Sequence, residues 1–117
     1  MKNRIKIIFL SLFYCSLGAT LQAEVVYAFP LNGAEQEIGN MLEWRTASES
    51  NSQAFIVEKS TDGTSFQNLG MIEAAGISFE EKVYRFLDIN ATSGIAFYRL
   101  KQLDKDGTTS YTDVIQI

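Results

Sequence analysis

The chain has 117 residues and a formal net charge of −4, and it contains no histidine. Its length suits a single domain. Without histidine, Ser-His-Asp and Cys-His catalysis and histidine-ligated zinc are excluded. The single cysteine, Cys15, lies near the N-terminus, and no glycine-rich phosphate loop is present. We therefore expect a protein that is not an enzyme and binds no cofactor.

The first 23 residues have the order of a secretory signal peptide. Basic residues Lys2, Arg4 and Lys6 precede an apolar run at 7–19, and small residues lead to a cleavage site after Ala23. The alternative, a membrane anchor, needs a run of roughly 20 apolar residues, which is longer than this one. We expect export to the periplasm, the cell surface or the medium, with no membrane span after cleavage.

The segment left after cleavage, residues 24–117, is acidic and lacks cysteine. Cys15 sits inside the apolar run behind Tyr14, which also disfavours lipidation. Three of the ten Lys and Arg and none of the 14 Asp and Glu lie in residues 1–23, so the remaining 94 residues carry a net charge of −7. Such a surface repels phosphate backbones, and we expect no binding to nucleic acid.

Short alternating runs separated by turn formers predict an all-β domain. In "MLEWRT", for example, Leu42 and Trp44 share one face, opposite Glu43 and Arg45. The predicted strands lie at 25–31, 41–46, 54–60, 66–76, 82–88, 97–103 and 110–117, and the predicted turns at 49–52, 60–63, 89–94 and 104–107. Seven short antiparallel strands favour a two-sheet sandwich. Its expected core consists of Leu42, Trp44, Phe55, Val57, Tyr84, Phe86, Tyr98 and Leu100.

Three further aromatic residues could face solvent. Tyr27, Phe79 and Phe97 fall outside the predicted core face. An exposed aromatic platform would suit contact with a sugar or a peptide. The alternative is that these rings pack between the sheets and the loops.

The stretch "LDKDGTTSY" is the most metal-like string in the chain. Asp104 and Asp106 are weak candidates for a calcium site, but no Glu follows to close an EF-hand loop. Asp-Gly between alternating runs is instead a strong hairpin signal. The similar stretch "STDGTSF" around Asp62 supports the hairpin interpretation, so we expect no metal site.

Two long stretches resemble one family. They are "LEWRTASESNSQAFIVEKSTDGTSF" and "YRFLDINATSGIAFYRLKQLDKDGTTSYTDVIQI", with "WRTASE" and "FYRLKQLDKDG" as the most specific parts. Together they resemble a fibronectin type III-like module of secreted proteins from bacteria with type IX secretion. The resemblance implies an immunoglobulin/fibronectin type III-like sandwich over residues 24–117. It also implies that Trp44 is the core tryptophan of the second strand. Tyr98 would be the corner tyrosine near the start of the sixth strand, with its hydroxyl bonded back to upstream backbone.

Such modules act as spacers, adhesive units or accessory domains and have no catalytic residues to carry over. The family's usual C-terminal sorting domain does not follow Ile117, which leaves surface display by type IX secretion in doubt. We expect a non-catalytic structural or protein-interaction module that serves adhesion, spacing or envelope assembly. Its partner would be another envelope or secreted protein, with the last run, "YTDVIQI", as a candidate for strand addition. The alternative is a carbohydrate-binding module that holds polysaccharide with Tyr27, Phe79 and Phe97.

Overall fold

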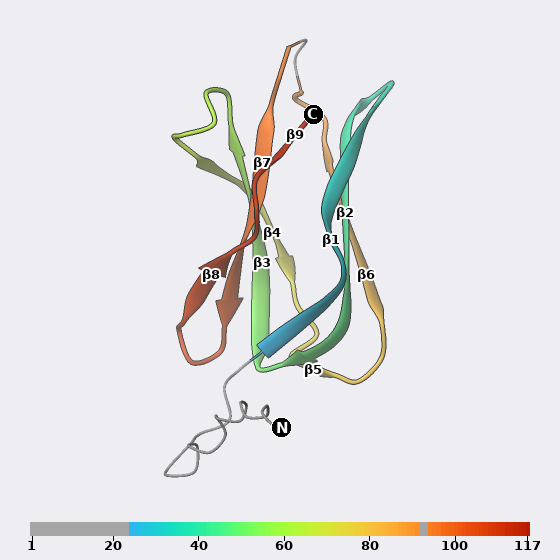
Figure 1. Ribbon diagram of the computed structural model, residues 1–117, viewed down its shortest axis with the longest axis vertical. Coiled ribbons are helices and arrows are strands. Elements are labelled where there is room, and N and C mark those ends of the chain that lie inside the picture. Colours follow the sequence, from blue (N-terminus) through green and yellow to red (C-terminus); the bar gives the residue numbers. More distant parts are fainter. Residues whose placement is uncertain (1–23, 92–93) are drawn as a thin grey trace, which may run out of the picture.

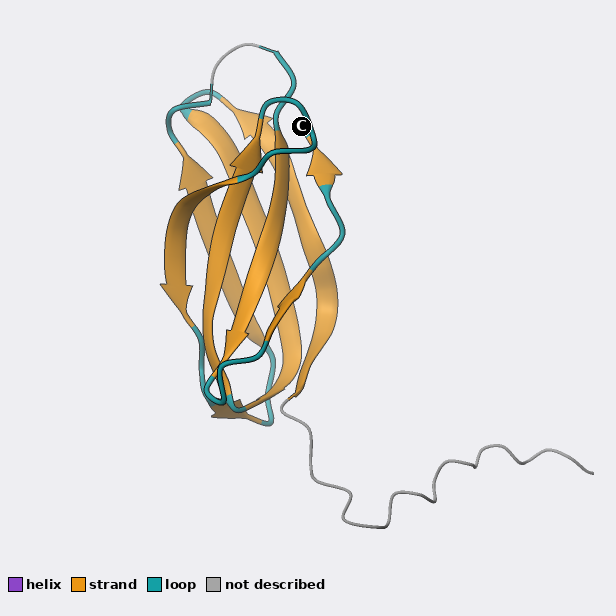
Figure 2. Ribbon diagram, turned by 90° about the vertical axis from the view of Figure 1, so that its left-hand side faces the viewer, coloured by secondary structure: helices purple, strands orange, loops and turns teal. Residues whose placement is uncertain are grey.

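The computed structural model describes residues 24–91 and 94–117, and within them every regular element is a β-strand (Figures 1 and 2). The predicted signal peptide, residues 1–23, lies outside the described residues. The all-β prediction is confirmed. The strands are β1 (Glu24–Gln36), β2 (Gly39–Ser50), β3 (Ser52–Ser60), β4 (Gln67–Glu73), β5 (Ile77–Ser78), β6 (Lys82–Asp88), β7 (Phe97–Asp104), β8 (Thr109–Tyr111) and β9 (Ile115–Gln116).

The strands form two antiparallel sheets, as expected for a sandwich (Figure 1). In one sheet β2 lies between β1 and β6, and the short β5 pairs with β2 beyond the end of β6. In the other sheet the order is β4-β3-β7, with β8 and β9 both pairing with the free side of β7. The predicted seven strands are thus the six long ones plus an interrupted last strand, while β5 was not predicted.

The core forms where the alternating faces of the two sheets meet. On β7 every second side chain is buried, as the period of a strand requires. Trp44 stacks on Tyr84 with ring centroids 5.6 Å apart, and Phe55 packs its ring against both. Among the predicted core residues, only Tyr84 and Phe86 are half-buried, and both still pack against the core. The buried members are Leu42, Trp44, Phe55, Val57, Tyr98 and Leu100.

The predicted surface turn at 49–52 was wrong, because β2 continues to Ser50 and β3 begins at Ser52. Here the chain crosses from one sheet to the other, and only Asn51 leaves the strand conformation, with a φ of 63°. Glu49 and Ser52 on either side are buried. A sharp crossing between the sheets turns these polar side chains inward, where local composition suggested a solvated loop.

The last predicted strand is interrupted. Between β8 and β9 the hydroxyl of Thr112 accepts the N–H of Leu100 at 2.9 Å, a bond that a continuous strand would make through its backbone. The interruption changes which side chains face inward. Ile115 packs against the core, whereas Tyr111 lies on the outer surface. Strict alternation along the predicted strand 110–117 would place Tyr111 and Ile115 on one face, and the interruption separates them.

Candidate interaction surfaces

The three aromatic residues predicted as ligand contacts lie in different settings. Phe79 is 90% exposed, just after β5. Tyr27 is half-buried, packs against the core and donates a hydrogen bond from its hydroxyl to Gln102 at 3.0 Å. Burial, with smaller effects from the charges of Glu49 and Asp104, raises the pKa of Tyr27 above its usual range. Its role is structural.

Phe97 and Phe79 lie at opposite ends of the sandwich. Phe97 is half-buried, pairs with Ser60 at one end of β3 and has its ring against Gly63. The segment before Phe79 is bonded to Ser52 at the other end of β3. Eight residues of strand span about 26 Å. The structure therefore does not bring the three predicted aromatics together into one platform.

A different aromatic residue, Phe29, lies on the solvent-facing side of the β1–β2–β6 sheet. We call this side the outer face. The Phe29 ring is 55% exposed and lies 5.4 Å from the guanidinium of Arg45. Arg45 pairs with Val83 on β6, and Val83 is also exposed. The first row of the outer face is thus an aromatic ring, an arginine and a valine, one from each strand.

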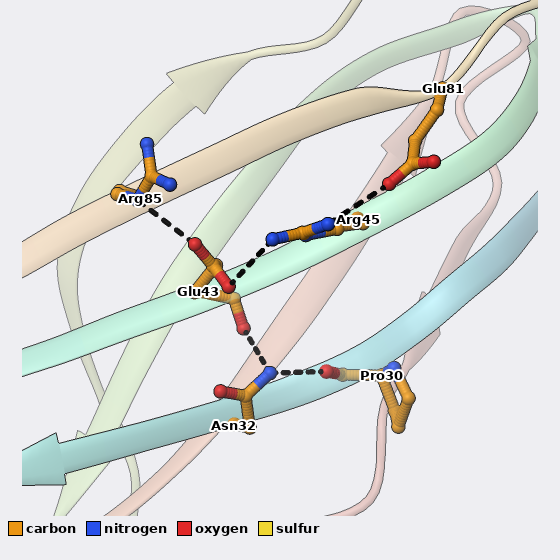
Figure 3. A network of polar contacts seen from close by, with 6 residues as sticks. All are labelled: Pro30, Asn32, Glu43, Arg45, Glu81 and Arg85. Atoms are coloured by element: carbon orange, nitrogen blue, oxygen red, sulfur yellow. Dashed lines mark hydrogen bonds and ion pairs between the residues drawn. The ribbon is translucent and has the colours of Figure 1, made fainter.

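Charged residues form the second part of the outer face (Figure 3). The Nε of Arg85 donates to one carboxylate oxygen of Glu43 at 2.9 Å. The Nη2 of Arg45 lies 3.7 Å from the other oxygen. Arg45 also reaches Glu81 at 3.3 Å. The amide of Asn32 donates to the backbone carbonyls of both Pro30 and Glu43, at 3.1 Å each. The network fixes the side chains of Glu43 and Arg45, which are the centre of the outer face.

A shallow hollow of about 420 Å³ is bordered by Phe29, Pro30, Asn32, Glu43 and Arg45. Sequence reasoning missed it for a local reason. Strict alternation would place Phe29 on the same side as Tyr27 and Leu31, but the pairing of β1 with β2 is irregular at 26–32 and turns Phe29 outward. The neighbouring Pro30, which fits an edge strand, was the one available signal.

The opposite surface, formed by β3, β7 and β8, holds a stacked arginine. The guanidinium of Arg99 lies 4.1 Å from the ring centroids of both Phe66 and Tyr111. Its Nε also donates to Glu58 at 2.8 Å. Because both faces of the guanidinium are covered, Arg99 holds β8 against the sheet and offers little free surface to a ligand.

Glu49 is buried between the sheets, and neutral donors surround it. Its carboxylate accepts hydrogen bonds from the hydroxyls of Ser52, Tyr84 and Thr46 and from the N–H of Ala75. Burial by itself would raise the pKa of Glu49, but these hydrogen bonds outweigh it and hold the pKa below its ordinary value. Burial, together with the hydrogen bond to this carboxylate, raises the pKa of Tyr84 above its usual range. We call this group the Glu49 cluster.

Asp88 forms the second buried cluster. It accepts the ammonium of Lys59 at 2.6 Å and the hydroxyl of Tyr98 at 2.6 Å. Tyr98 in turn accepts the amide of Asn40 at 3.0 Å. The predicted bond from the Tyr98 hydroxyl to upstream backbone was wrong. The acceptor is instead the side-chain carboxylate of Asp88, ten residues upstream. Burial opposes ionisation of Asp88, yet the bonds from Lys59, Tyr98 and the N–H of Asn90 lower its pKa.

The environment of Tyr98 also affects its own ionisation. Burial and the neighbouring carboxylate of Asp88 raise the pKa of Tyr98 to about 12. The hydroxyl therefore stays protonated at physiological pH and remains a donor to Asp88. We call Asp88, Lys59, Tyr98 and Asn40 the Asp88 cluster.

The prediction of a turn at Asp106-Gly107 is confirmed. The N–H of Gly107 donates to the carbonyl of Asp104 at 2.9 Å, and Gly107 has a φ of 92°, which suits glycine. The side chain of Asp106 accepts both the N–H and the hydroxyl of Thr108, which lowers its pKa. The described part of the chain contains no group of three or more His, Cys, Asp or Glu side chains that could hold a metal ion.

The loop between β3 and β4 uses the same chemistry. Asp62 accepts the N–H groups of Ser65 and Thr64 and the hydroxyl of Ser60. These bonds, the backbone ones first, lower the pKa of Asp62 to about 2. Both Asp-Gly stretches therefore use an aspartate as a turn acceptor.

Comparison with models of protein families, with curated proteins and with solved structures found no match to this chain. Within residues 24–91 and 94–117, no helix has the length and apolar character that crossing a membrane requires.

Proposed function

We propose that this protein is an exported, non-catalytic module of the fibronectin type III-like kind that binds another envelope or secreted protein. The outer face is the single observation that carries the proposal. It combines an exposed aromatic ring, an exposed valine and a central arginine on three neighbouring strands. Aromatic residues and arginine are enriched where proteins meet.

The ion network makes the outer face suitable for binding. Arg45 is oriented by Glu43, Glu81 and the ring of Phe29, so that little side-chain freedom remains to be lost when a partner binds. The site is also on strands, which hold their side chains more firmly than loops do. A partner with apolar groups opposite Phe29 and Val83, and with charges that complement Glu43 and Arg45, would fit it.

The sheet arrangement supports assignment to the fibronectin type III-like kind. Three strands face four, if the interrupted β8 and β9 are taken as one, and Trp44 lies on the second strand. Tyr98 lies near the start of β7, which is the sixth strand when the two-residue β5 is not counted. These positions agree with the ones that the sequence resemblance implies. The order of charged, apolar and small residues in 1–23 supports export.

The non-catalytic part of the proposal rests on chemistry. The chain has no histidine, and its one cysteine lies in residues 1–23. The two buried carboxylates, Glu49 and Asp88, are engaged by internal donors and are held ionised. They stabilise the fold and are poorly suited to exchange protons with a substrate.

A pull-down from the native cell envelope tests the proposal. The tagged chain is compared with a Phe29→Ala/Arg45→Ala variant and with Met71→Ala, a control that removes an exposed apolar side chain from the other sheet. We expect a protein that the chain and the control recover and the double variant loses. The recovered protein, once purified, should bind the double variant at least about tenfold more weakly, as truncation of hot-spot residues does. Equal recovery by all three proteins would reject the outer face.

Carbohydrate binding is the second candidate, and exposed Phe79 is the observation that favours it. Tyr27 and Phe97 are half-buried in separate places, so a sugar would meet one ring and not a platform. A polysaccharide array discriminates between the two functions. Binding that Phe79→Ala abolishes and Phe29→Ala/Arg45→Ala retains would favour the carbohydrate function.

A further inference from the structure

The two long sides of the sandwich differ in how closely the sheets meet. On the side of β4 and β6, the ring of Phe86 covers Gly70, and a Cβ at Gly70 would lie 2.6 Å from that ring. On the other side β1 faces β8 and β9, which follow one another along the free side of β7 (Figure 1). Ile117 closes the part beside β9, because a Cβ at Gly33 of β1 would lie 2.6 Å from its Cδ1.

Beside β8 the sheets part, and two hollows lie between β1 and β8. Their volumes are about 290 and 370 Å³. Both are bordered by Tyr27, Gln102 and Ser110, so they form one continuous depression, which we call the seam groove. One hollow extends to Asp113 and the other to Asp104. Binding sites for small ligands usually have volumes of about 300–1,000 Å³, so the seam groove has the size of such a site.

Two buried polar side chains form the floor of the seam groove. Gln102 is 7% exposed and Asp104 is 6% exposed. The hydroxyl of Tyr27 donates to the amide oxygen of Gln102 at 3.0 Å, and the amide nitrogen of Gln102 donates to Asp104 at 3.2 Å. Burial raises the pKa of Tyr27 above its usual range, so its hydroxyl stays a donor. Tyr27 and Asp104 together fix which end of the Gln102 amide carries the N–H groups.

The floor has hydrogen-bonding capacity that the fold does not use. The Gln102 amide has two N–H groups, and within residues 24–91 and 94–117 only the one bound to Asp104 has an acceptor. Each oxygen of Asp104 accepts one side-chain donor, from Gln102 or Thr108, and an oxygen of this kind can accept a second. Ser110, which pairs with Gln102 and is exposed, adds a hydroxyl. A few fixed polar groups of this kind are what orients a ligand.

The two walls of the seam groove differ in polarity. On the β1 side the lining residues are Val25, Pro30 and the part of Tyr27 that stays exposed. On the β8 side the lining consists mainly of hydroxyl-bearing residues, such as Ser110. A sugar ring has C–H groups on its faces and hydroxyls around its edge, and each hydroxyl both donates and accepts. The polarity of the walls and floor therefore matches a sugar chain.

An extended peptide would fit the seam groove less well. Adding a strand needs a regular edge with free backbone groups. β8 has only three residues, and β1 contains Pro30 and pairs irregularly with β2 at 26–32. Such features protect an edge from further pairing. The polar floor also lacks apolar sites for the alternate side chains of a strand.

The charge of the seam groove favours a neutral ligand. Among the described residues that border it, none is lysine or arginine, and residues 24–117 carry a net charge of −7, so anionic ligands are repelled. Cleavage after Ala23 would place an α-amino group beside Glu24, at the end away from Asp113, and would offset that carboxylate. At the centre, both oxygens of Asp104 already hold internal donors, which weakens its attraction for a cation.

We propose that the seam groove binds a neutral polysaccharide, whose hydroxyls bond to Gln102 and Asp104 and whose C–H faces lie on the β1 wall. The site shares no side chain with Phe29, Arg45 and Val83 of the outer face, so it does not depend on the proposed protein partner. It also differs from Phe79, which offers a sugar one ring without fixed polar groups. With both surfaces in use, the module links an envelope protein to a glycan.

A panel of soluble oligosaccharides tests the proposal. The full chain is titrated by calorimetry with neutral oligomers of glucose, xylose, mannose and N-acetylglucosamine, and with oligogalacturonate as the anionic comparison. We expect at least one neutral oligomer to bind. Ser110→Tyr should weaken that binding at least about tenfold, because the added ring occupies the groove. Ser65→Tyr is the matched control, since Ser65 is equally an exposed serine but lies in the loop between β3 and β4, and it should leave binding unchanged.

Nuclear magnetic resonance locates the contact directly. The side-chain N–H signals of Gln102 should shift as the neutral oligomer is added, whereas those of Gln67, an exposed residue of β4, should not. Raising the salt from about 50 to about 500 mM should leave the affinity unchanged, because a neutral ligand makes no ion pair that salt can screen.

Each outcome decides a separate part of the proposal. Binding that Ser110→Tyr leaves intact, or that shifts no Gln102 signal, overturns the seam groove as the site. Tighter binding of oligogalacturonate, or binding that salt weakens, overturns the neutral ligand. If no neutral oligomer binds, the glycan function is rejected. The protein partner is tested separately by the Phe29→Ala/Arg45→Ala pull-down, in which Ser110→Tyr should recover the same protein as the unchanged chain.

Discussion

Two pairs of carboxylates in this molecule accept hydrogen bonds in contrasting settings. Glu49 and Asp88 are buried between the sheets, whereas Asp62 and Asp106 lie in exposed turns. All four have a pKa below the ordinary value. In the turns the hydrogen bonds account for the lowered pKa directly, while in the interior they must first overcome the cost of burial.

This difference indicates where stability depends on these groups. A turn carboxylate that loses its donors finds water, and so do the donors. A buried carboxylate that is removed leaves donors without partners in a place that water does not reach. Removing a buried acceptor should therefore cost much more than removing an exposed one, although the local hydrogen bonds look alike.

Substitution of Glu49 should have the largest effect. Glu49→Ala leaves the hydroxyls of Ser52, Tyr84 and Thr46 and the N–H of Ala75 without their acceptor. We expect the free energy of unfolding, measured in urea, to fall by about 3–5 kcal/mol. Glu49→Gln keeps one acceptor oxygen and should lose less. A loss below about 1 kcal/mol in the alanine variant would show that the cluster rearranges around the gap.

Substitution of Asp88 should rank second. Asp88→Ala leaves the ammonium of Lys59 unpaired, but Tyr98 keeps its bond from Asn40. We expect a loss of about 2–3 kcal/mol in the free energy of unfolding.

A second substitution separates the two buried clusters. Because the partner of Asp88 is a cation, Lys59→Met in the Asp88→Ala background removes the unpaired charge and should recover part of the loss. If Lys59→Met makes the Asp88→Ala protein still less stable, the ion pair is not the reason for the cost. No such rescue is expected for Glu49, whose partners are all neutral.

Acid should weaken the fold through the same two residues. The pKa of each is lower in the folded than in the unfolded chain, so each stabilises the fold above the unfolded value of about 4. That contribution is lost as the pH falls through the folded pKa. Free energies of unfolding between about pH 7 and pH 2 should therefore decline on the acid side, less steeply in Glu49→Gln and in Asp88→Asn. Parallel curves for the chain and both variants would contradict the assignment.

The two pairs also differ in what could be predicted from the sequence. Alternation located the strands and the buried face of β2 and β7, since a period of two is a local property. The Asp-Gly turns could also be predicted, because the turn preference of Asp-Gly is likewise a local property. Glu49 was assigned to a surface turn because it stands in "ESNS", a run of turn-forming residues.

The partners of the buried carboxylates explain why they were missed. Tyr84 is 35 residues from Glu49 in the sequence, and Lys59 approaches Asp88 from the other sheet. Such contacts depend on how the two sheets are placed, which no short window of sequence specifies. The one local signal was the spacing of Thr46, Glu49 and Ser52, three residues apart, and it becomes meaningful only once the chain crosses between sheets at Asn51.

Among the exposed carboxylates, Asp62 should matter more. Asp62→Ala removes the acceptor of the Thr64 and Ser65 N–H groups, and their amide hydrogens should exchange faster with solvent. The melting temperature should fall less than in either buried variant. Asp62→Asn, which keeps the acceptor oxygen, is the control and should exchange nearly as the unchanged chain does. The pKa of Asp62 is about 2, so its carboxylate stays ionised to a lower pH than an ordinary aspartate. The amide hydrogens of Thr64 and Ser65 should therefore stay protected from exchange down to a lower pH.

Asp106 should have the smallest effect, and it decides whether "LDKDGTTSY" is more than a turn. Asp106 is engaged by Thr108, and the two oxygens of Asp104 accept Gln102 and the hydroxyl of Thr108. A calcium ion would have to displace these donors and find most of its six or more oxygen ligands in water. Calcium titration should therefore leave the melting temperature unchanged, both for the chain and for Asp106→Asn. A saturable rise in the melting temperature that Asp106→Asn removes would instead show that the turn opens to hold an ion, because only a ligand that prefers the folded state raises its stability.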